Sequence, residues 1–166
     1  MIANFVELLP VLNRHQVQFI LFGGGAGIVH GSQRVTSDVD VVYSRHPDNI
    51  ARLAEALKPH HPYLRGVPLG LPFCWDARTI QAGLNFTLTT DLGDIDFLGE
   101  VAGGGTYEQL LPFTIELHAF GVPCRCVTLD RLIQLKRAAG RVKDLEAIAE
   151  LQAIFRSEER RVGKEC

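Results

Sequence analysis

Two short segments of the chain each carry a pair of aspartates, two residues apart, beside an apolar run that is typical of a buried strand. These segments are Asp38-Val39-Asp40, at the start of 38–43, and Asp94-Ile95-Asp96, which leads into 95–98. Residues i and i+2 point to the same face of a strand, so each pair aims both carboxylates one way. The Cα atoms of a pair are then about 6.6 Å apart. Like charges this close repel unless a cation lies between them.

The residue types favour magnesium as that cation. If the two strands are neighbours, a third carboxylate joins Asp38 and Asp40. Magnesium accepts a few carboxylates together with water and substrate phosphates, whereas an all-aspartate cluster suits neither zinc nor copper. Two ions about 3.5–4 Å apart would match such a cluster. Asp96 is preferred over Asp94 as the third ligand because it lies deeper in the apolar strand. A solvated strand edge is the competing interpretation.

Three consecutive glycines, Gly23 to Gly25, interrupt a predicted strand at 16–22 and open a short helix at 26–30. Such a turn exposes backbone N–H groups that suit phosphate, although a glycine triplet is more often a simple turn. The spacing does not match a dinucleotide-binding fingerprint, because Ile28 stands where the last small residue is needed. No Gly-Lys-Ser/Thr follows, which excludes a P-loop.

Hydrophobic periodicity predicts helices that alternate with strands along the rest of the chain. Helices are expected at 3–14, 49–57, 77–82, 129–139 and 143–155, and further strands at 85–90, 114–119 and 122–127. The segment 60–72 is rich in proline and glycine and is expected to be a loop. Because helical crossovers mix with adjacent strands, we expect an α/β (α+β) fold with a mixed β-sheet flanked by helices.

Two segments together resemble a known family. The first runs from Gly24-Gly25 through His30-Gly31 and Arg34-x-Thr36 to Asp38-x-Asp40, and the second is 129–144. They resemble the signature of minimal bacterial nucleotidyltransferases of the DNA polymerase beta superfamily, and the resemblance covers about Phe5 to Leu151. Nucleotidyltransferase toxins of toxin–antitoxin systems are more distant. Two departures stand out: many members have serine at the position of Gly25, and Val142 replaces a common proline.

The resemblance implies a polymerase-beta-like nucleotidyltransferase fold and a two-metal, NTP-dependent enzyme that transfers an NMP and releases pyrophosphate. By that resemblance, Asp38 and Asp40 hold two Mg²⁺ ions, and Asp96 completes the acceptor-side metal and helps to activate the attacking group. All three would be catalytic. Gly24 and Gly25 would bind the β- and γ-phosphates through backbone N–H groups.

Each of the supporting residues could serve either the site or the structure. Arg34 is placed either to meet phosphate or to pair with an acid, and Lys136 either reaches the nucleotide or lies on a solvated helix face. For Lys143, a position on a solvated helix face is the preferred interpretation. His30 is expected to make a local hydrogen bond rather than to act as a base. Three aromatic residues that could stack on a base are expected in the core instead: Tyr43, Trp75 and Phe86.

Composition bears on partners and compartment. A net charge of −2 gives no general attraction to nucleic acid or membrane, and no run reaches the roughly 18 apolar residues of a membrane span. The start of the chain lacks a signal-peptide pattern, and the four cysteines lack zinc spacings, so we expect a cytoplasmic protein with reduced cysteines. The expected partners are an NTP such as ATP, an acceptor that is RNA, protein or a small molecule, and a partner protein or second copy. An inactive nucleotide- or partner-binding module, for example a toxin–antitoxin component, is the alternative.

The last ten residues differ from the rest. The segment 157–166 reads SEERRVGKEC, has no apolar period and follows a helix expected to be complete. It also resembles a translated sequencing adapter. We therefore predict a single nucleotidyltransferase domain over 1–156, with 157–166 as a disordered or artefactual tail.

Overall fold

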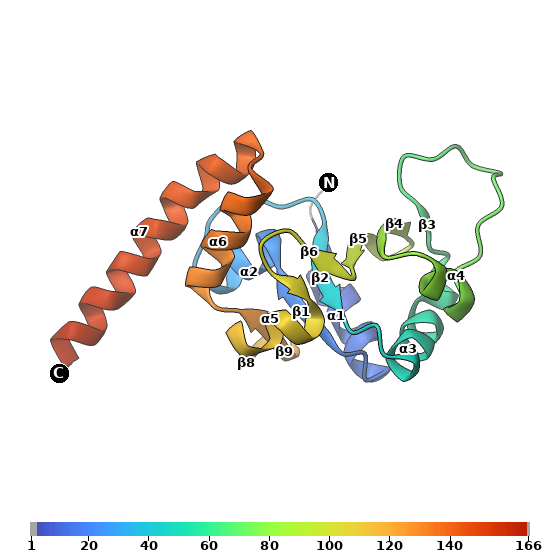
Figure 1. Cartoon of the computed structure of the whole chain (residues 1–166), viewed down its shortest axis with the longest axis horizontal. Coiled ribbons are helices and arrows are strands. Elements are labelled where there is room, and N and C mark those ends of the chain that lie inside the picture. The colour runs from blue at the N-terminus through green and yellow to red at the C-terminus, as the bar shows by residue number, and fades with distance from the viewer. Residues whose placement is uncertain (1–2, 166) are drawn as a thin grey trace.

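A mixed seven-stranded sheet organises the chain in the computed structural model, which describes residues 3–165 (Figure 1). The strand order is β3-β4-β5-β2-β1-β9-β8. The strands are β1 (Phe19–Phe22), β2 (Val39–Tyr43), β3 (Tyr63–Leu64), β4 (Asn85–Thr90), β5 (Gly93–Leu98), β8 (Thr114–Ala119) and β9 (Val122–Val127). The pairs β2–β5 and β1–β9 are parallel and the other neighbours are antiparallel, which confirms the mixed sheet. A separate ladder joins β6 (Glu100–Val101) to β7 (Gly105–Thr106).

Helices flank this sheet, as expected. They are α1 (Phe5–Arg14), α2 (Gly23–Val29), α3 (Pro47–Leu57), α4 (Ala77–Ala82), α5 (Tyr107–Leu110), α6 (Leu129–Ala139) and α7 (Val142–Glu165), with short 3-10 turns at Lys58–His60 and Leu111–Phe113. Helix α1 contacts α3 and β9, α2 contacts β1, β2 and α6, and α6 packs against α7. Figure 1 shows α6 and α7 on one side of the molecule and α3 and α4 on the other.

The two central strands form the middle of the core. Ile20 and Leu21 of β1 and Val39, Val41 and Val42 of β2 are fully buried. Asp40 lies between Val39 and Val41 on β2 and is half-buried. Alternation along β2 therefore sets this carboxylate beside the apolar core, where the sequence predicts it.

The three aromatic residues pack in the core or against it. Tyr43 and Phe86 are buried, and the ring of Trp75 meets that of Phe86 edge-on with centroids 5.5 Å apart. The Tyr43 hydroxyl donates a hydrogen bond to the Leu84 carbonyl at 2.8 Å. The prediction of packing rather than base stacking is confirmed for these residues.

Two predicted elements differ in length from those observed. The strand expected at 16–22 begins only at Phe19, because Gln16 has a positive φ of 55° and the Val17 N–H donates to the Leu12 carbonyl at the end of α1. The last helix, expected to end at 155, continues to Glu165. Residues 157–162 contain no proline or glycine, so nothing local stops the helix there. That 157–166 lies outside the domain, or is foreign to it, stays a prediction.

The cysteines on β9 are packing residues. Cys124 and Cys126 are buried free thiols, and burial raises their pKa to about 11 and about 12. Cys74 is an exposed free thiol, and Cys166 lies outside the described residues. Among residues 3–165, no helix is both long enough and apolar enough to cross a membrane.

Candidate active site

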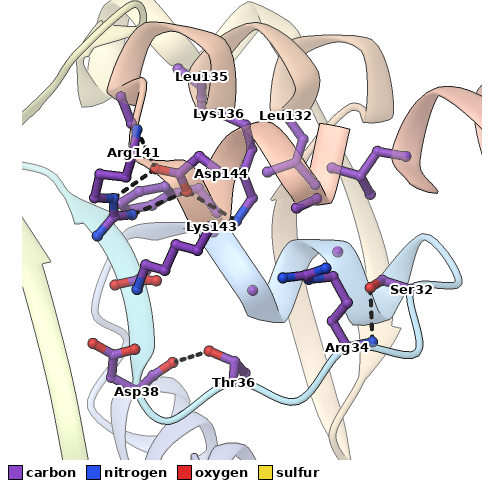
Figure 2. A pocket seen from close by; sticks show the side chains of 18 of the residues that line it. Ser32, Arg34, Thr36, Asp38, Leu132, Leu135, Lys136, Arg141, Lys143 and Asp144 are labelled. Atoms are coloured by element: carbon purple, nitrogen blue, oxygen red, sulfur yellow. Dashed lines mark hydrogen bonds and ion pairs between the residues drawn. The ribbon is translucent and has the colours of Figure 1, made fainter. Parts of the chain in front are cut away.

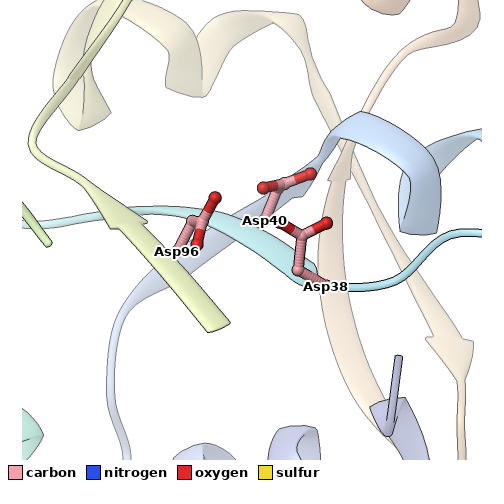
Figure 3. A group of neighbouring side chains, drawn as sticks. All are labelled: Asp38, Asp40 and Asp96. Atoms are coloured by element: carbon pink, nitrogen blue, oxygen red, sulfur yellow. The ribbon is translucent and has the colours of Figure 1, made fainter. Parts of the chain in front are cut away.

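Three aspartates from two parallel strands meet at one point. In the register of β2 with β5, Asp40 lies opposite Asp96 and Val39 opposite Ile95. Asp38 precedes β2 and points to the same side. One carboxylate oxygen from each of Asp38, Asp40 and Asp96 lies within 4.8 Å of the other two (Figure 3). The predicted convergence of these three side chains is therefore present.

Gly23 makes room for this cluster where β1 turns into α2. Its φ is +63°, and Phe22, the residue before it, pairs with Asp40. A Cβ atom at Gly23 would clash with Oδ2 of Asp40. Glycine is thus needed here for both its backbone angle and its missing side chain.

Two of the carboxylates, Asp40 and Asp96, have a raised pKa. Burial, together with the charges of Asp38 and Asp96, raises the pKa of Asp40 to about 8. Burial also raises the pKa of Asp96, although Arg65 opposes this with a hydrogen bond and its charge. The cluster therefore has more negative charge than its surroundings compensate. Its all-oxygen donor set and this charge deficit fit a hard divalent cation such as Mg²⁺.

Asp94 lies next to the cluster. Its Oδ2 is 3.4 Å from Nε of Arg65, and the group of three mutually close carboxylates contains Asp96 instead. The geometry therefore agrees with the preference for Asp96, whose role as a metal ligand stays a prediction.

A cavity of about 560 Å³ opens beside the aspartates. Asp38, Asp40 and Asp96 line it together with cationic side chains and with apolar side chains of β5, the β6 region and α6. The cations are Arg34, Lys136, Arg141 and Lys143, and the apolar residues include Leu98, Val101, Leu132 and Leu135. Figure 2 shows Arg34, Lys143 and the carboxylate of Asp38 around the same space. The cavity therefore combines acidic, basic and apolar walls.

The glycines of α2 have different surroundings. Gly24 lines the cavity, and a Cβ atom there would lie 2.5 Å from Oγ1 of Thr36. Gly25 is buried, and a Cβ atom there would lie 2.5 Å from the Phe5 ring, so a serine at 25 has no room. Among the described residues, Gly23, Gly24 and Gly27 line the cavity and Gly25 does not. Phosphate binding by Gly24 and Gly25 stays a prediction.

Arg34 pairs with an acid and also lies at the cavity, so both interpretations of this residue hold in part. Its Nη2 lies 3.6 Å from a carboxylate oxygen of Glu146, and both side chains are exposed. The guanidinium also lines the cavity. An exposed pair of this kind contributes little to stability, so Arg34 can exchange Glu146 for an anionic ligand.

Lys136 does not lie on a solvated face, because its side chain is only 16% exposed. Its Nζ is 3.7 Å from Asp144, which is 1% exposed and also accepts a 2.6 Å hydrogen bond from Nε of Arg141. Burial lowers the pKa of Lys136, against the opposing charges of Asp144 and Asp40. Burial also works against ionisation of Asp144, but Arg141 and Lys136 outweigh it, and the pKa of Asp144 is lowered. Asp144 therefore holds two cations at the cavity wall.

Sequence reasoning missed Arg65 and the burial of Asp144. Arg65 falls in the segment expected to be a loop, yet its Nη2 lies 2.6 Å from Asp96 and its Nη1 3.3 Å from Asp38. No local pattern marks it, since the contact depends on the pairing of β3 with β4. His30 is structural as predicted: its Nε2–H donates to the Val127 carbonyl at 2.8 Å.

Comparison with known proteins shows which solved structures share this fold. No protein-family model matches the sequence, and a search of curated proteins finds no match. The solved structures that are similar in fold include the following two. The lincosamide antibiotic adenylyltransferase LnuA in its lincomycin-bound form has a TM-score of 0.58 and 14% identity, covering 89% of this chain and 93% of that one. TM1012 of Thermotoga maritima, assigned to the nucleotidyltransferases, has a TM-score of 0.51 and 13% identity over 89% and 93%. The chain therefore has the polymerase-beta-like nucleotidyltransferase fold.

Proposed function

We propose that this protein is a Mg²⁺-dependent nucleotidyltransferase that moves an NMP from an NTP to an acceptor and releases pyrophosphate. The observation that carries the proposal is the meeting of Asp38, Asp40 and Asp96 at a cavity that four cationic side chains also line. Carboxylates that need a cation and cations that need an anion then share one space, and a magnesium–triphosphate complex supplies both.

The positions of the residues around the cavity suggest which of them would bind metal and which would bind the nucleotide. Asp38 and Asp40 would hold two Mg²⁺ ions, and Asp96 would complete the acceptor-side ion. Bound there, the ions would neutralise phosphate charge and lower the pKa of the attacking group. Lys136 and Arg141, which Asp144 orients, would face the triphosphate together with Lys143. The backbone N–H groups of Gly24 and Gly25 would bind its β- and γ-phosphates. The apolar wall of the cavity would suit the base.

In the transfer itself, an acceptor oxygen attacks the α-phosphorus in line. The new P–O bond forms as the bond to pyrophosphate breaks, and the proton of the acceptor group passes to the Asp96 carboxylate. The cations at 136, 141 and 143 compensate the charge that develops on the leaving pyrophosphate, which is the largest contribution a site of this kind makes.

ATP and a small-molecule acceptor are the first substrates to test. LnuA, one of the structures similar in fold, is a lincosamide antibiotic adenylyltransferase, and this likeness motivates that order. RNA and protein acceptors stay open, as does acceptor recognition by a partner protein or a second copy. We further propose the cytoplasm as the compartment, where NTPs and reduced thiols such as Cys124 and Cys126 occur together.

One observation favours a second candidate, a module that binds nucleotide without turnover. Arg65 contributes a positive charge to Asp38 and Asp96, so the carboxylates are partly neutralised without any metal. In an inactive module this pairing would be permanent, and the cationic wall would still bind an NTP.

The test is incubation of the protein with each labelled NTP and Mg²⁺, together with RNA, protein and small-molecule fractions. Pyrophosphate release and a mass increment of one NMP on one fraction support transfer. Asp38→Asn and Asp40→Asn should abolish both signals. Calorimetric NTP binding without pyrophosphate release from any fraction would favour the binding module instead.

A further inference from the structure

We propose that Arg65 is the resident counter-ion of the acidic cluster, and that divalent cations enter the cluster by displacing its guanidinium. The inference rests on the proposed function, since it concerns how the same three aspartates receive metal. It assigns to this chain a residue that controls cation affinity without being a metal ligand.

The contacts of Arg65 span the acids of both strands. Its Nη2 donates to Asp96 at 2.6 Å, its Nη1 to Asp38 at 3.3 Å, and its Nε lies 3.4 Å from Asp94. The Arg65 side chain is 27% exposed, and the aspartates are between 21% and 24% exposed. A planar guanidinium is suited to such a position, because its donors fan out in one plane toward several oxygens.

Arg65 satisfies the cluster incompletely. Its guanidinium contacts Asp38, Asp94 and Asp96, and among the described residues it makes no hydrogen bond or ion pair with Asp40. The Arg65 Nε is buried and makes no hydrogen bond of good geometry among the described residues. Arg65 thus brings one positive charge to three carboxylates, whereas a divalent cation brings twice that charge to a smaller volume. We therefore expect a divalent cation to displace the guanidinium.

The two cations compete for the same groups. Asp38 and Asp96 accept from Arg65, and both belong to the group of three mutually close carboxylates. A carboxylate drawn toward a guanidinium is less available to a metal, and repulsion between the two cations adds to the competition. Arg65 therefore stabilises the metal-free protein and weakens its metal binding by the same contacts.

The position of Arg65 in the chain allows it to withdraw. It directly follows the two-residue strand β3, held there by its N–H to the Thr87 carbonyl and its Nη2 to the Leu88 carbonyl. The segment 66–76 after it has no helix or strand and extends away from the sheet (Figure 1). Gly66 and Gly70 in it have positive φ and open space around them, and Leu69 is 89% exposed. Moving the side chain outward disturbs this edge and leaves the buried core intact.

The experiment compares the full chain with its Arg65→Met and Arg125→Met variants in Mn²⁺ binding, followed by electron paramagnetic resonance without nucleotide. Arg125 is the matched control: its side chain is 30% exposed and pairs with Glu116 on the β8–β9 hairpin, away from the aspartates. We expect Arg65→Met to tighten Mn²⁺ binding about tenfold or more, and Arg125→Met to leave it unchanged. Without metal, Arg65→Met should unfold at a lower temperature, and Mn²⁺ should raise that temperature more than it does for the unaltered chain.

Two outcomes separate the possible failures. If the unaltered chain binds Mn²⁺ and Arg65→Met binds it no more tightly, the inference is overturned while the metal site stands. If neither binds Mn²⁺ at millimolar concentration, the metal-dependent function fails as well. Should Arg65→Met not fold, Arg65→Lys replaces it. This variant keeps the positive charge but lacks the planar guanidinium that donates to several carboxylates at once. It should therefore bind Mn²⁺ more tightly than the unaltered chain. Equal or weaker binding by Arg65→Lys overturns the inference.

Discussion

Asp40 on β2 and Asp96 on β5 lie directly opposite each other across a parallel strand pair. In a folded protein without bound metal, this relationship is unfavourable, because two carboxylates beside a core repel each other and lose hydration. It becomes favourable once a divalent cation lies between them. A metal-free protein with this arrangement is less stable than one without it, and the difference can be measured as a free energy of unfolding.

Replacing Asp40 by asparagine should stabilise the metal-free protein and abolish transfer. The raised pKa of Asp40 means that its stabilising protonated form is lost as pH rises from about 4 to about 8. The unaltered chain should therefore lose stability over that range, and Asp40→Asn should lose less, since only the raised pKa of Asp96 then remains in the cluster. We expect a gain of about 1–2 kcal/mol for the variant at pH 8.5, measured by urea unfolding with a chelator present. Pyrophosphate release should fall at least about a hundredfold.

The control is Asp48→Asn, since the Asp48 side chain is 77% exposed and lies at the start of α3, which follows the end of β2 opposite to Asp38. This variant should keep both the activity and the loss of stability between pH 4 and pH 8. A stability profile of Asp40→Asn that runs parallel to that of the unaltered chain between pH 4 and pH 8 contradicts the electrostatic account of the cluster.

Replacing Asp144 by asparagine should weaken both the fold and nucleotide binding. The change leaves Lys136 and Arg141 without their shared buried partner, which we expect to lower the free energy of unfolding by about 2 kcal/mol at pH 7. Because the pKa of Asp144 is lowered, its contribution is present above its unfolded pKa and disappears as pH falls through the folded value. The difference between the two proteins should shrink toward pH 3.

Nucleotide affinity separates the site role of Asp144 from its structural one. The KM for NTP should rise in Asp144→Asn, since two cations at the cavity wall lose their orientation. Asp130→Asn, on the exposed first turn of α6, is the matched control and should leave the KM unchanged. An unchanged KM in Asp144→Asn would show that the contacts of Asp144 with Lys136 and Arg141 serve the fold alone.

The parts of the site that could be predicted are those set by local pattern. Alternation over two residues puts Asp38 beside Asp40 and Asp94 beside Asp96, and the apolar residues between them mark both segments as strands. The strand at Asn85–Thr90, the hairpin of β8 and β9 and helix α6 follow from the same reasoning and match their predicted bounds.

The parts that could not be predicted depend on long-range packing. Arg65 reaches Asp96 only because β3 pairs with β4 and β4 with β5. Asp144 is buried only because α7 packs on α6. Neither arrangement leaves a periodic trace in the sequence. The continuation of α7 to Glu165 shows the opposite case, in which residues without an apolar period still extend a helix that has already formed.

The Phe5 ring leaves no room for a side chain at position 25. A serine there would meet the ring, so Gly25→Ser should cost about 1–3 kcal/mol by overpacking. Phe5→Leu removes the ring, and the double variant should recover part of that loss. A double-mutant cycle by chemical unfolding measures the coupling; strictly additive effects would contradict the contact.

Removing 157–166 should leave the domain unchanged. Most residues from 157 to 163 are exposed, so a chain ending at Arg156 should keep its thermal midpoint within about 2 °C and its transfer activity. A shortened chain that aggregates or loses activity would show that the last turns of α7 belong to the domain.

Crystals soaked with Mn²⁺ and a non-hydrolysable ATP analogue provide the most direct measurement, through the anomalous scattering of the metal. We expect two manganese peaks among Asp38, Asp40 and Asp96, with the triphosphate directed toward Lys136 and Arg141 and the guanidinium of Arg65 moved away. A nucleotide bound in the cavity with no manganese peak at these carboxylates would show that the three aspartates do not form a metal site.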